Sequence, residues 1–122
     1  MQPIVYTVDG EERTRQSLTE AIESTGVQTR GFASAEAFLQ FRWRRQSAYL
    51  LAEIDLPGIS GLELLSRMRQ LEASIPTLLI TSRYEVPLAV EAVKLGATDL
   101  IPKPVVTGAL LRRLARLLNK TA

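Results

Sequence analysis

The sequence predicts an α/β fold in which helices cover both faces of a five-stranded parallel sheet. One observation is that strand-like apolar runs alternate with longer helix-like stretches along the chain. Another is that residues 49–52 and 78–80 are almost continuously apolar, which is typical of strands buried on both faces by helical crossovers. A chain of 122 residues suits one domain with a single core, here residues 1–122.

The strands are expected at residues 4–8, 27–32, 48–53, 77–81 and 98–101. Between the first two strands, an amphipathic helix is predicted to stop at Gly26. Its polar residues are Glu12, Arg13, Arg15, Gln16 and Glu20. Leu18, Ala21 and Ile22 recur on one side of this helix at helical spacing. These side chains are therefore expected to face the sheet.

The second and third helices have clear start and stop signals. Ser34 is expected to cap the second helix, because its side-chain oxygen can accept hydrogen bonds from first-turn amides. The third helix is expected to follow residues 57–61 and to end before Pro76, which prevents further helix. The apolar residues expected to pack from these two helices are Phe38, Leu39, Phe41, Leu62, Leu64, Leu65, Met68 and Leu71.

The fourth helix has Pro87 in its first turn and is expected to end near Gly96. Val86, Val90 and Val93 share one of its sides, and we expect most of them to belong to the core. The last helix has the clearest amphipathic pattern. Its apolar stripe is formed by Leu110, Leu111, Leu114, Leu117 and Leu118.

Composition excludes several kinds of site. Without Cys or His, the chain has no disulfide, no thiolate or imidazole metal ligand and no histidine base. Its 15 basic and 13 acidic residues are too balanced to imply a nucleic-acid or membrane surface. No apolar stretch approaches membrane-spanning length and no signal-like segment precedes the first strand. We therefore expect a cytoplasmic domain.

Four polar residues end or follow the predicted strands, namely Asp9, Glu53, Thr81 and Lys103. Right-handed crossovers place the functional crevice of such a sheet beyond the carboxyl ends of its strands. The four side chains are therefore expected to converge at one edge.

These residues, in this order and on these elements, resemble the receiver domain of a two-component response regulator. The resemblance covers practically the whole chain and is carried by residues 4–9, 32–36, 56–65, 80–82 and 103–104. Residues 32–36 and 86–90 look most like FixJ-type receivers, which commonly precede a helix-turn-helix DNA-binding domain. The resemblance implies a flavodoxin-like (βα)5 three-layer sandwich with strand order 2-1-3-4-5.

The resemblance also implies adjacent acids in the first loop that hold Mg²⁺, whereas this chain reads Asp9-Gly10-Glu11. Asp9 matches, but Gly10 stands where the direct metal ligand would be. Glu11 could offer a carboxylate from the next position. Because Mg²⁺ requires closely placed hard oxygens, we expect weak or absent Mg²⁺ binding and no other cofactor.

Glu53 occupies the position of the phosphoacceptor aspartate, four residues before Pro57. Its extra methylene displaces the attacking oxygen, and such a misplacement costs on the order of 100-fold in rate. In the family, the residue at Asp55 lends its backbone carbonyl to the metal, and its side chain is expected to point away from the pocket. The implied metal ligands are thus Asp9, Glu53 and the Asp55 carbonyl.

Two further positions match the family and two depart from it. Thr81 and Lys103 match the hydroxyl and the ammonium that contact the phosphoryl group, and the bond from Lys103 to Pro104 is expected to be cis. Leu100 replaces the aromatic switch residue, and Val105 replaces a common Phe.

These departures favour a phosphorylation-independent receiver that acts through protein–protein contacts and is not an enzyme. Glu53 is expected to reach Lys103, with Thr81 as a further contact, and so to hold one surface conformation. One alternative is a residually phosphorylatable receiver, using Glu53 or Asp55, that controls a DNA-binding output domain. A remote alternative is a flavodoxin-like domain for a flavin or another small ligand, which the acidic residues 9–12 disfavour because they would repel a phosphate.

The resemblance implies a sensor kinase or another protein partner. It also implies a homodimer through the fourth helix, the fifth strand and the last helix. Residues 41–45 combine Phe41 and Trp43 with three arginines, so a nucleic-acid or protein contact there stays open. We expect instead that these cations lie near the negative end of a helix dipole. Residues 119–122 are expected to begin a linker.

Overall fold

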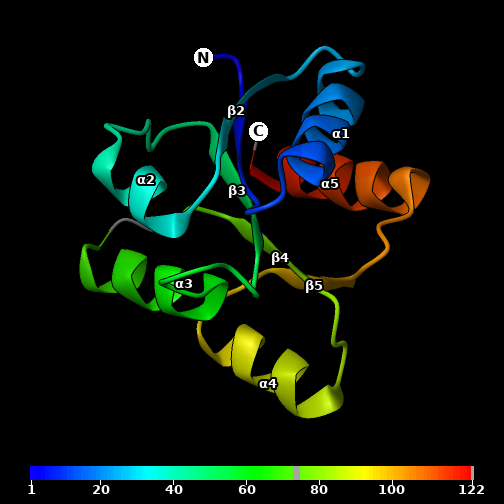
Figure 1. Cartoon of the computed structure of the whole chain (residues 1–122). Coiled ribbons are helices and arrows are strands. Elements are labelled where there is room, and N and C mark those ends of the chain that lie inside the picture. The colour runs from blue at the N-terminus through cyan, green and yellow to red at the C-terminus, as the bar shows by residue number, and fades with distance from the viewer. Residues whose placement is uncertain (73–74, 122) are drawn as a thin grey trace.

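The structure, a computed structural model, describes residues 1–72 and 75–121. Within these residues, five parallel strands form one sheet in the order β2-β1-β3-β4-β5, with helices on both faces (Figure 1). The strands are β1 (Ile4–Val8), β2 (Gln28–Phe32), β3 (Ala48–Glu53), β4 (Thr77–Thr81) and β5 (Asp99–Pro102). The helices are α1 (Glu12–Glu23), α2 (Ala35–Gln40), α3 (Gly61–Gln70), α4 (Val86–Lys94) and α5 (Thr107–Thr121). The predicted fold class and strand order are confirmed.

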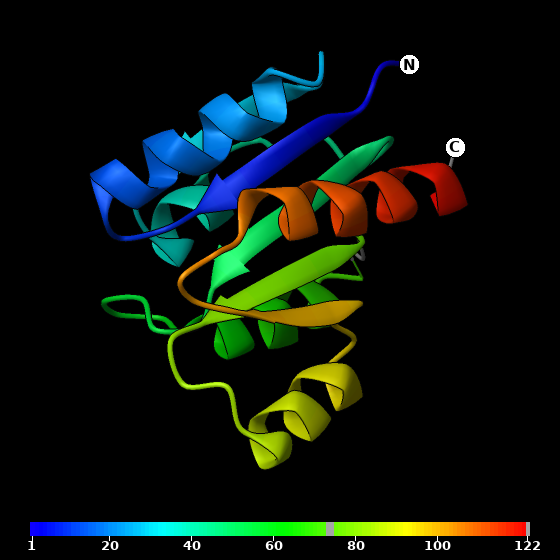
Figure 2. The same ribbon diagram turned by 90° about the vertical axis from the view of Figure 1, so that its right-hand side faces the viewer.

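The sheet separates two apolar cores. Helices α1 and α5 cover one face, where Leu51 packs with Ile22 and Leu110 (Figures 1 and 2). Helices α2, α3 and α4 cover the other face, where Leu50 packs with Phe38. Leu50 and Leu51 enter opposite cores because successive strand side chains point to opposite faces. This arrangement explains why the central strands are apolar at nearly every position.

The strand register fixes where the chain leaves the sheet. Val8 pairs with Ala52, and Thr81 pairs with Pro102. Three neighbouring chain segments therefore emerge at the same edge. The residues at these exits are Asp9, Glu53 and Lys103.

Local signals set several helix boundaries as predicted. Ser34 accepts a hydrogen bond from the Ala37 amide at 3.0 Å, which confirms it as the cap of α2. Ser60 caps α3 in the same way, accepting from the Glu63 amide at 3.1 Å. The boundaries of β2 and β5 differ from the predicted ones by a single position, which is within the usual uncertainty of strand ends.

The exposed side of α4 corrects one expectation. Val86, Val90 and Val93 are 73%, 47% and 61% exposed, so placing most of them in the core was wrong. The buried Ala92 and the half-buried Leu88 face the sheet instead. Both sides of this helix are apolar, so its hydrophobic spacing alone does not identify the buried one.

Two other expectations about helix surfaces and ends were wrong. Leu71, expected to extend the apolar stripe of α3, is 57% exposed just beyond the helix end. Helix α5 continues to Thr121, so no linker begins at Asn119, while Ala122 lies outside the described residues. Among residues 1–72 and 75–121, no helix combines the length and apolar character needed to cross a membrane.

Arg44 has a different role from the helix-dipole contact expected for residues 41–45. Helix α2 ends at Gln40, and the Arg44 guanidinium donates to the backbone oxygens of Gln2, Gln46 and Ser47 rather than to the last carbonyls of the helix. Arg44 therefore joins the segment before β1 to the segment before β3.

Candidate functional site at the carboxyl edge of the sheet

Lys103 lies between two carboxylates. Its Nζ atom is 3.0 Å from Glu53 Oε1 and 3.3 Å from Asp9 Oδ2. The side chains of Asp9, Glu53 and Lys103 are 1%, 13% and 20% exposed, so the three charges meet largely shielded from water. The predicted contact between Glu53 and Lys103 is present.

The β1–α1 loop holds Asp9 in position. Its Oδ1 atom accepts a hydrogen bond from the Glu11 amide at 2.9 Å, and its backbone oxygen accepts one from Arg15 Nη1 at 2.8 Å. The sequence did not indicate this contact of Arg15. No local pattern marks it, because it depends on how α1 packs beside the end of β1.

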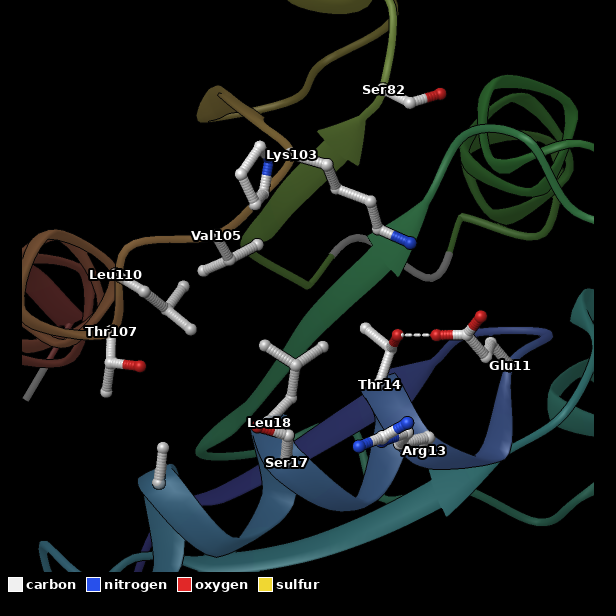
Figure 3. A pocket seen from close by; sticks show the side chains of 12 residues that line it. Glu11, Arg13, Thr14, Ser17, Leu18, Ser82, Lys103, Val105, Thr107 and Leu110 are labelled. Atoms are coloured by element: carbon white, nitrogen blue, oxygen red, sulfur yellow. Dashed lines mark hydrogen bonds between the residues drawn. The ribbon is translucent and has the colours of Figure 1, made fainter.

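The Glu11 side chain is bound by a neighbouring residue. Its carboxylate accepts a hydrogen bond from the Thr14 hydroxyl, on the first turn of its own helix (Figure 3). At Gly10, an added Cβ would lie 3.1 Å from Pro57 Cδ, so a larger residue needs a small movement of this ring. Within the described parts of the chain, no three acidic side chains gather in an arrangement that could hold a metal ion.

Asp55 and Thr81 lie beside the charge cluster without joining it. The Asp55 carboxylate accepts hydrogen bonds from the Ser82 hydroxyl and the Arg83 guanidinium, each at 3.3 Å. The buried Thr81 hydroxyl accepts a hydrogen bond from the Arg83 amide at 3.0 Å. Among the described residues, the expected further contact between Thr81 and Glu53 is not formed.

The two positions that depart from the family's aromatic residues both hold aliphatic side chains in the cores. Leu100 is 3% exposed and belongs to the core beneath α2, α3 and α4. Val105 is half-buried against the core beneath α1 and α5. The peptide bond between Lys103 and Pro104 is cis, as expected.

Burial and charge shift two pKa values at this site. Burial raises the pKa of Glu53 above its usual value, the neighbouring Asp9 raises it further, and Lys103 only partly offsets these effects. Burial would lower the pKa of Lys103, but hydrogen bonds and charges from Glu53 and Asp9 together outweigh it and raise this pKa. The lysine is therefore a fixed cation near neutral pH, while Glu53 is the group whose ionisation burial opposes.

A groove of about 620 Å³ runs from this cluster between α1 and the start of α5 (Figure 3). Lys103 lies at one end, where its ammonium group is directed toward the side of α1 that carries Thr14. Leu18, Val105 and Leu110 give the groove an apolar lining. Of the cluster, Lys103 is the residue that lines this surface depression, while the Asp9 side chain is only 1% exposed.

The loop between β3 and α3 is held by a residue that sequence reasoning did not identify as part of the site. Glu36 Oε2, from the first turn of α2, accepts a hydrogen bond from the Ile59 amide at 3.2 Å. Gly58 has a φ of +78°, and a Cβ there would overlap the Glu36 carboxylate. Glycine at this position therefore allows the positive φ of the turn, and it leaves room for the Glu36 carboxylate.

Comparison with known proteins gives a consistent result. Residues 5–115 match the response regulator receiver domain family. The chain is 41% identical to the transcriptional regulatory protein FixJ of Rhizobium meliloti (strain 1021) over 100 residues, which cover 82% of this chain and 49% of that protein. It is 35% identical to FixJ of Azorhizobium caulinodans over 118 residues, which cover 97% of this chain and 56% of that protein.

The fold is likewise similar to solved structures. The crystal structure of FixJ-N superimposes with a TM-score of 0.87 at 35% identity, covering 98% of this chain and 95% of the other. The chain spans about half the length of the FixJ proteins that it matches.

Proposed function

The chain belongs to the response regulator receiver domain family, and on this basis we propose that it is a receiver whose signalling state does not depend on phosphorylation. The observation that carries the proposal is the position of Lys103, whose ammonium group is already bound by Glu53 and Asp9. In this arrangement the longer Glu53 side chain places its carboxylate beside the lysine without any phosphorylation. The contacts hold the carboxyl edge of the sheet in one state.

Weak or absent Mg²⁺ binding is part of the same proposal. Octahedral Mg²⁺ requires several closely placed oxygen ligands. Gly10 has no carboxylate, the Glu11 carboxylate is bound by Thr14, and those of Asp9 and Glu53 face an ammonium group. This donor set does not fit the cation well, because Lys103 occupies the neighbourhood of both remaining acids.

Such a receiver acts through contacts with other proteins and has no enzymatic activity of its own. We propose that the chain forms a symmetric homodimer. Its interface would contain the exposed aliphatic residues of α4, together with β5 and α5. Residues 1–122 would form the receiver of a longer protein. This receiver would control a C-terminal DNA-binding domain, and the whole protein would act in the cytoplasm. Support for this arrangement comes from the FixJ relatives, which are transcriptional regulatory proteins about twice as long.

Titrations followed by NMR test the proposal. Mg²⁺ and then beryllium fluoride, which mimics a phosphoryl group, are added to the labelled chain. The expected result is small, non-saturating shifts at Asp9, Glu53, Thr81 and Lys103. Saturable shifts at these residues with both additions would show a working acceptor site and end the proposal.

The second candidate function is a residually phosphorylatable receiver. It is favoured by the position of Glu53, whose carboxylate retains 13% exposure directly beside Lys103. A Glu53 oxygen would attack the phosphorus of acetyl phosphate, forming an acyl phosphate and releasing acetate. Mass spectrometry after incubation with acetyl phosphate distinguishes the two candidates, since a phosphorylated peptide containing residue 53 or 55 supports the second and an unmodified chain supports the first.

A further inference from the structure

The basic residues are unevenly distributed along the chain. Residues 28–52 contain four arginines and one acidic residue, Glu36, which gives this segment a net charge of +3. The remaining residues carry 11 basic and 12 acidic side chains, a net charge of −1. A positive region on an otherwise nearly neutral protein attracts negatively charged partners.

Aromatic rings underlie this positive segment. Arg30 Cζ, on β2, lies 4.4 Å from the centre of the Phe41 ring, and Arg45 Cζ lies 5.5 Å from the centre of the Trp43 ring. A cation over an aromatic face is attracted by the ring, which restricts the guanidinium group to one region of the surface. The rings themselves pack as one cluster with centroid separations between 5.2 and 6.4 Å, formed by Tyr6, Phe32, Phe38, Phe41 and Trp43.

Three of the four arginines are available to a partner. Arg44 is occupied by the backbone oxygens before β1 and β3. Arg30, Arg42 and Arg45 are exposed, and no carboxylate pairs with them among residues 1–72 and 75–121. Each guanidinium group presents several N–H donors in a planar fork. Two of these guanidinium groups, those of Arg30 and Arg45, lie over the aromatic rings, and the exposed Arg42 lies between Phe41 and Trp43 in the chain.

The geometry favours carboxylates over nucleobases as ligands. Guanidinium groups bind carboxylates through paired, charge-assisted hydrogen bonds. Proteins that bind single-stranded nucleic acid commonly stack bases on free aromatic faces. Both rings of this loop are already engaged, because Phe38 stacks on Trp43 with an interplanar angle of 18°, Arg45 also lies over Trp43, and Arg30 lies over Phe41.

The surface is separate from the site described above. Its loop runs from the end of α2 to the start of β3, whereas Lys103 follows the carboxyl end of β5. Helix α2 also lies on the side of the molecule away from α5 (Figure 1). A partner bound here leaves the charge cluster and the exposed side of α4 free.

We propose that Arg30, Arg42 and Arg45 form a docking surface for an acidic segment of a partner protein. Phe41 and Trp43 are its rigid base, and Asp or Glu side chains of the partner pair with the guanidinium groups. This surface would bring a partner to the receiver independently of the state of Glu53.

A labelled acidic peptide tests this surface. The probe is a fluorescein-labelled peptide of alternating Glu and Gly, titrated with the whole chain and followed by fluorescence anisotropy. R42Q/R45Q is expected to weaken binding about tenfold or more, because it removes two charge-assisted contacts. R13Q/R67Q is the matched control, since it removes the same charge from α1 and α3, and it is expected to change binding by less than about twofold.

Other results would overturn the proposal. If R42Q/R45Q and R13Q/R67Q weaken peptide binding equally, the peptide is attracted only by the net charge of the protein. Tighter binding of an oligothymidine of equal charge would assign the surface to nucleic acid instead. NMR shifts caused by the peptide are expected at Arg30 and residues 41–46, and shifts confined to other residues would place the binding elsewhere. Circular dichroism of R42Q/R45Q checks folding, which should be retained because both side chains are exposed.

Discussion

The protonation of Glu53 connects the charge cluster to the stability of the domain. Burial raises the pKa of this carboxyl in the folded protein, so the folded state binds the proton more tightly than the unfolded chain does. The resulting stability is present below the unfolded pKa and is lost as the pH rises through the folded pKa. Ionised Glu53 therefore costs folding free energy even though it contacts Lys103.

The first prediction follows from the direction of this pH dependence. E53Q is expected to match the wild type in free energy of unfolding near about pH 4 and to exceed it at about pH 7, because glutamine does not ionise. Urea unfolding of both proteins across this range measures the difference. E63Q is the control, since its carboxylate is 56% exposed and its removal should have little effect at either pH. An E53Q protein that is less stable than the wild type at neutral pH would contradict the prediction.

The second prediction concerns the missing acid at position 10. G10D/E53D restores a carboxylate in the first loop and shortens the acceptor side chain. We expect Mg²⁺-dependent labelling by acetyl phosphate to rise on the order of 100-fold over the wild type, because the acceptor and the cation are then placed for in-line transfer. Mass spectrometry over a time course measures the rate.

G10N/E53D is the matched control for this experiment. Asparagine has nearly the size of aspartate and makes the same approach to Pro57, 3.1 Å from the position of its Cβ, but it lacks the charge. Equal labelling of the two double variants would show that the second carboxylate is not what the natural chain lacks.

Much of the charge cluster could be predicted from the sequence, residue by residue. Asp9, Glu53 and Lys103 each end or follow a strand, and parallel strands bring such residues to one edge. The supporting contacts of Arg15 and Glu36 could not be predicted, because each side chain reaches a backbone group of another element. Local spacing contains no information about such contacts.

Among the elements, α4 shows where hydrophobic patterns are ambiguous. Its valines are larger and more apolar than Ala92, yet Ala92 is buried and the valines are exposed. A small residue allows the helix to lie close to the sheet, so size selects the buried side where hydrophobicity does not. By contrast, α5 was predicted correctly at Leu110, Leu114 and Leu117, since its polar side is distinct.

The third prediction concerns the loop between β3 and α3. G58A is expected to lower the free energy of unfolding by about 2 kcal/mol, because alanine both strains the left-handed backbone and displaces Glu36 from the Ile59 amide. G26A should cost only about 1 kcal/mol, since it has a similar φ of +90° but meets no atom within 4 Å. Urea unfolding measures both losses, and equal values would mean that the Glu36 contact adds nothing.

At the scale of the whole molecule, the fourth prediction tests the homodimer proposed through the exposed side of α4. We expect the mass measured by light scattering to rise from monomer to dimer over a concentration series, and V90E to remain monomeric because it places a charge in an apolar contact. L71E is the control, since Leu71 is similarly exposed at the end of α3. A wild-type chain that stays monomeric throughout, or equal behaviour of both variants, would exclude a dimer through α4.

Trp43 is the single tryptophan of the chain, and its ring contacts both Phe38 and Arg45 at the proposed docking surface. Indole emission depends on polarity and on nearby cations, so the native protein contains its own optical reporter at that position. Occupation of Arg45 by an anion should alter this emission without any attached dye. Binding at the docking surface could therefore be followed in unlabelled protein. The same measurement would work in variants altered at the charge cluster around Lys103.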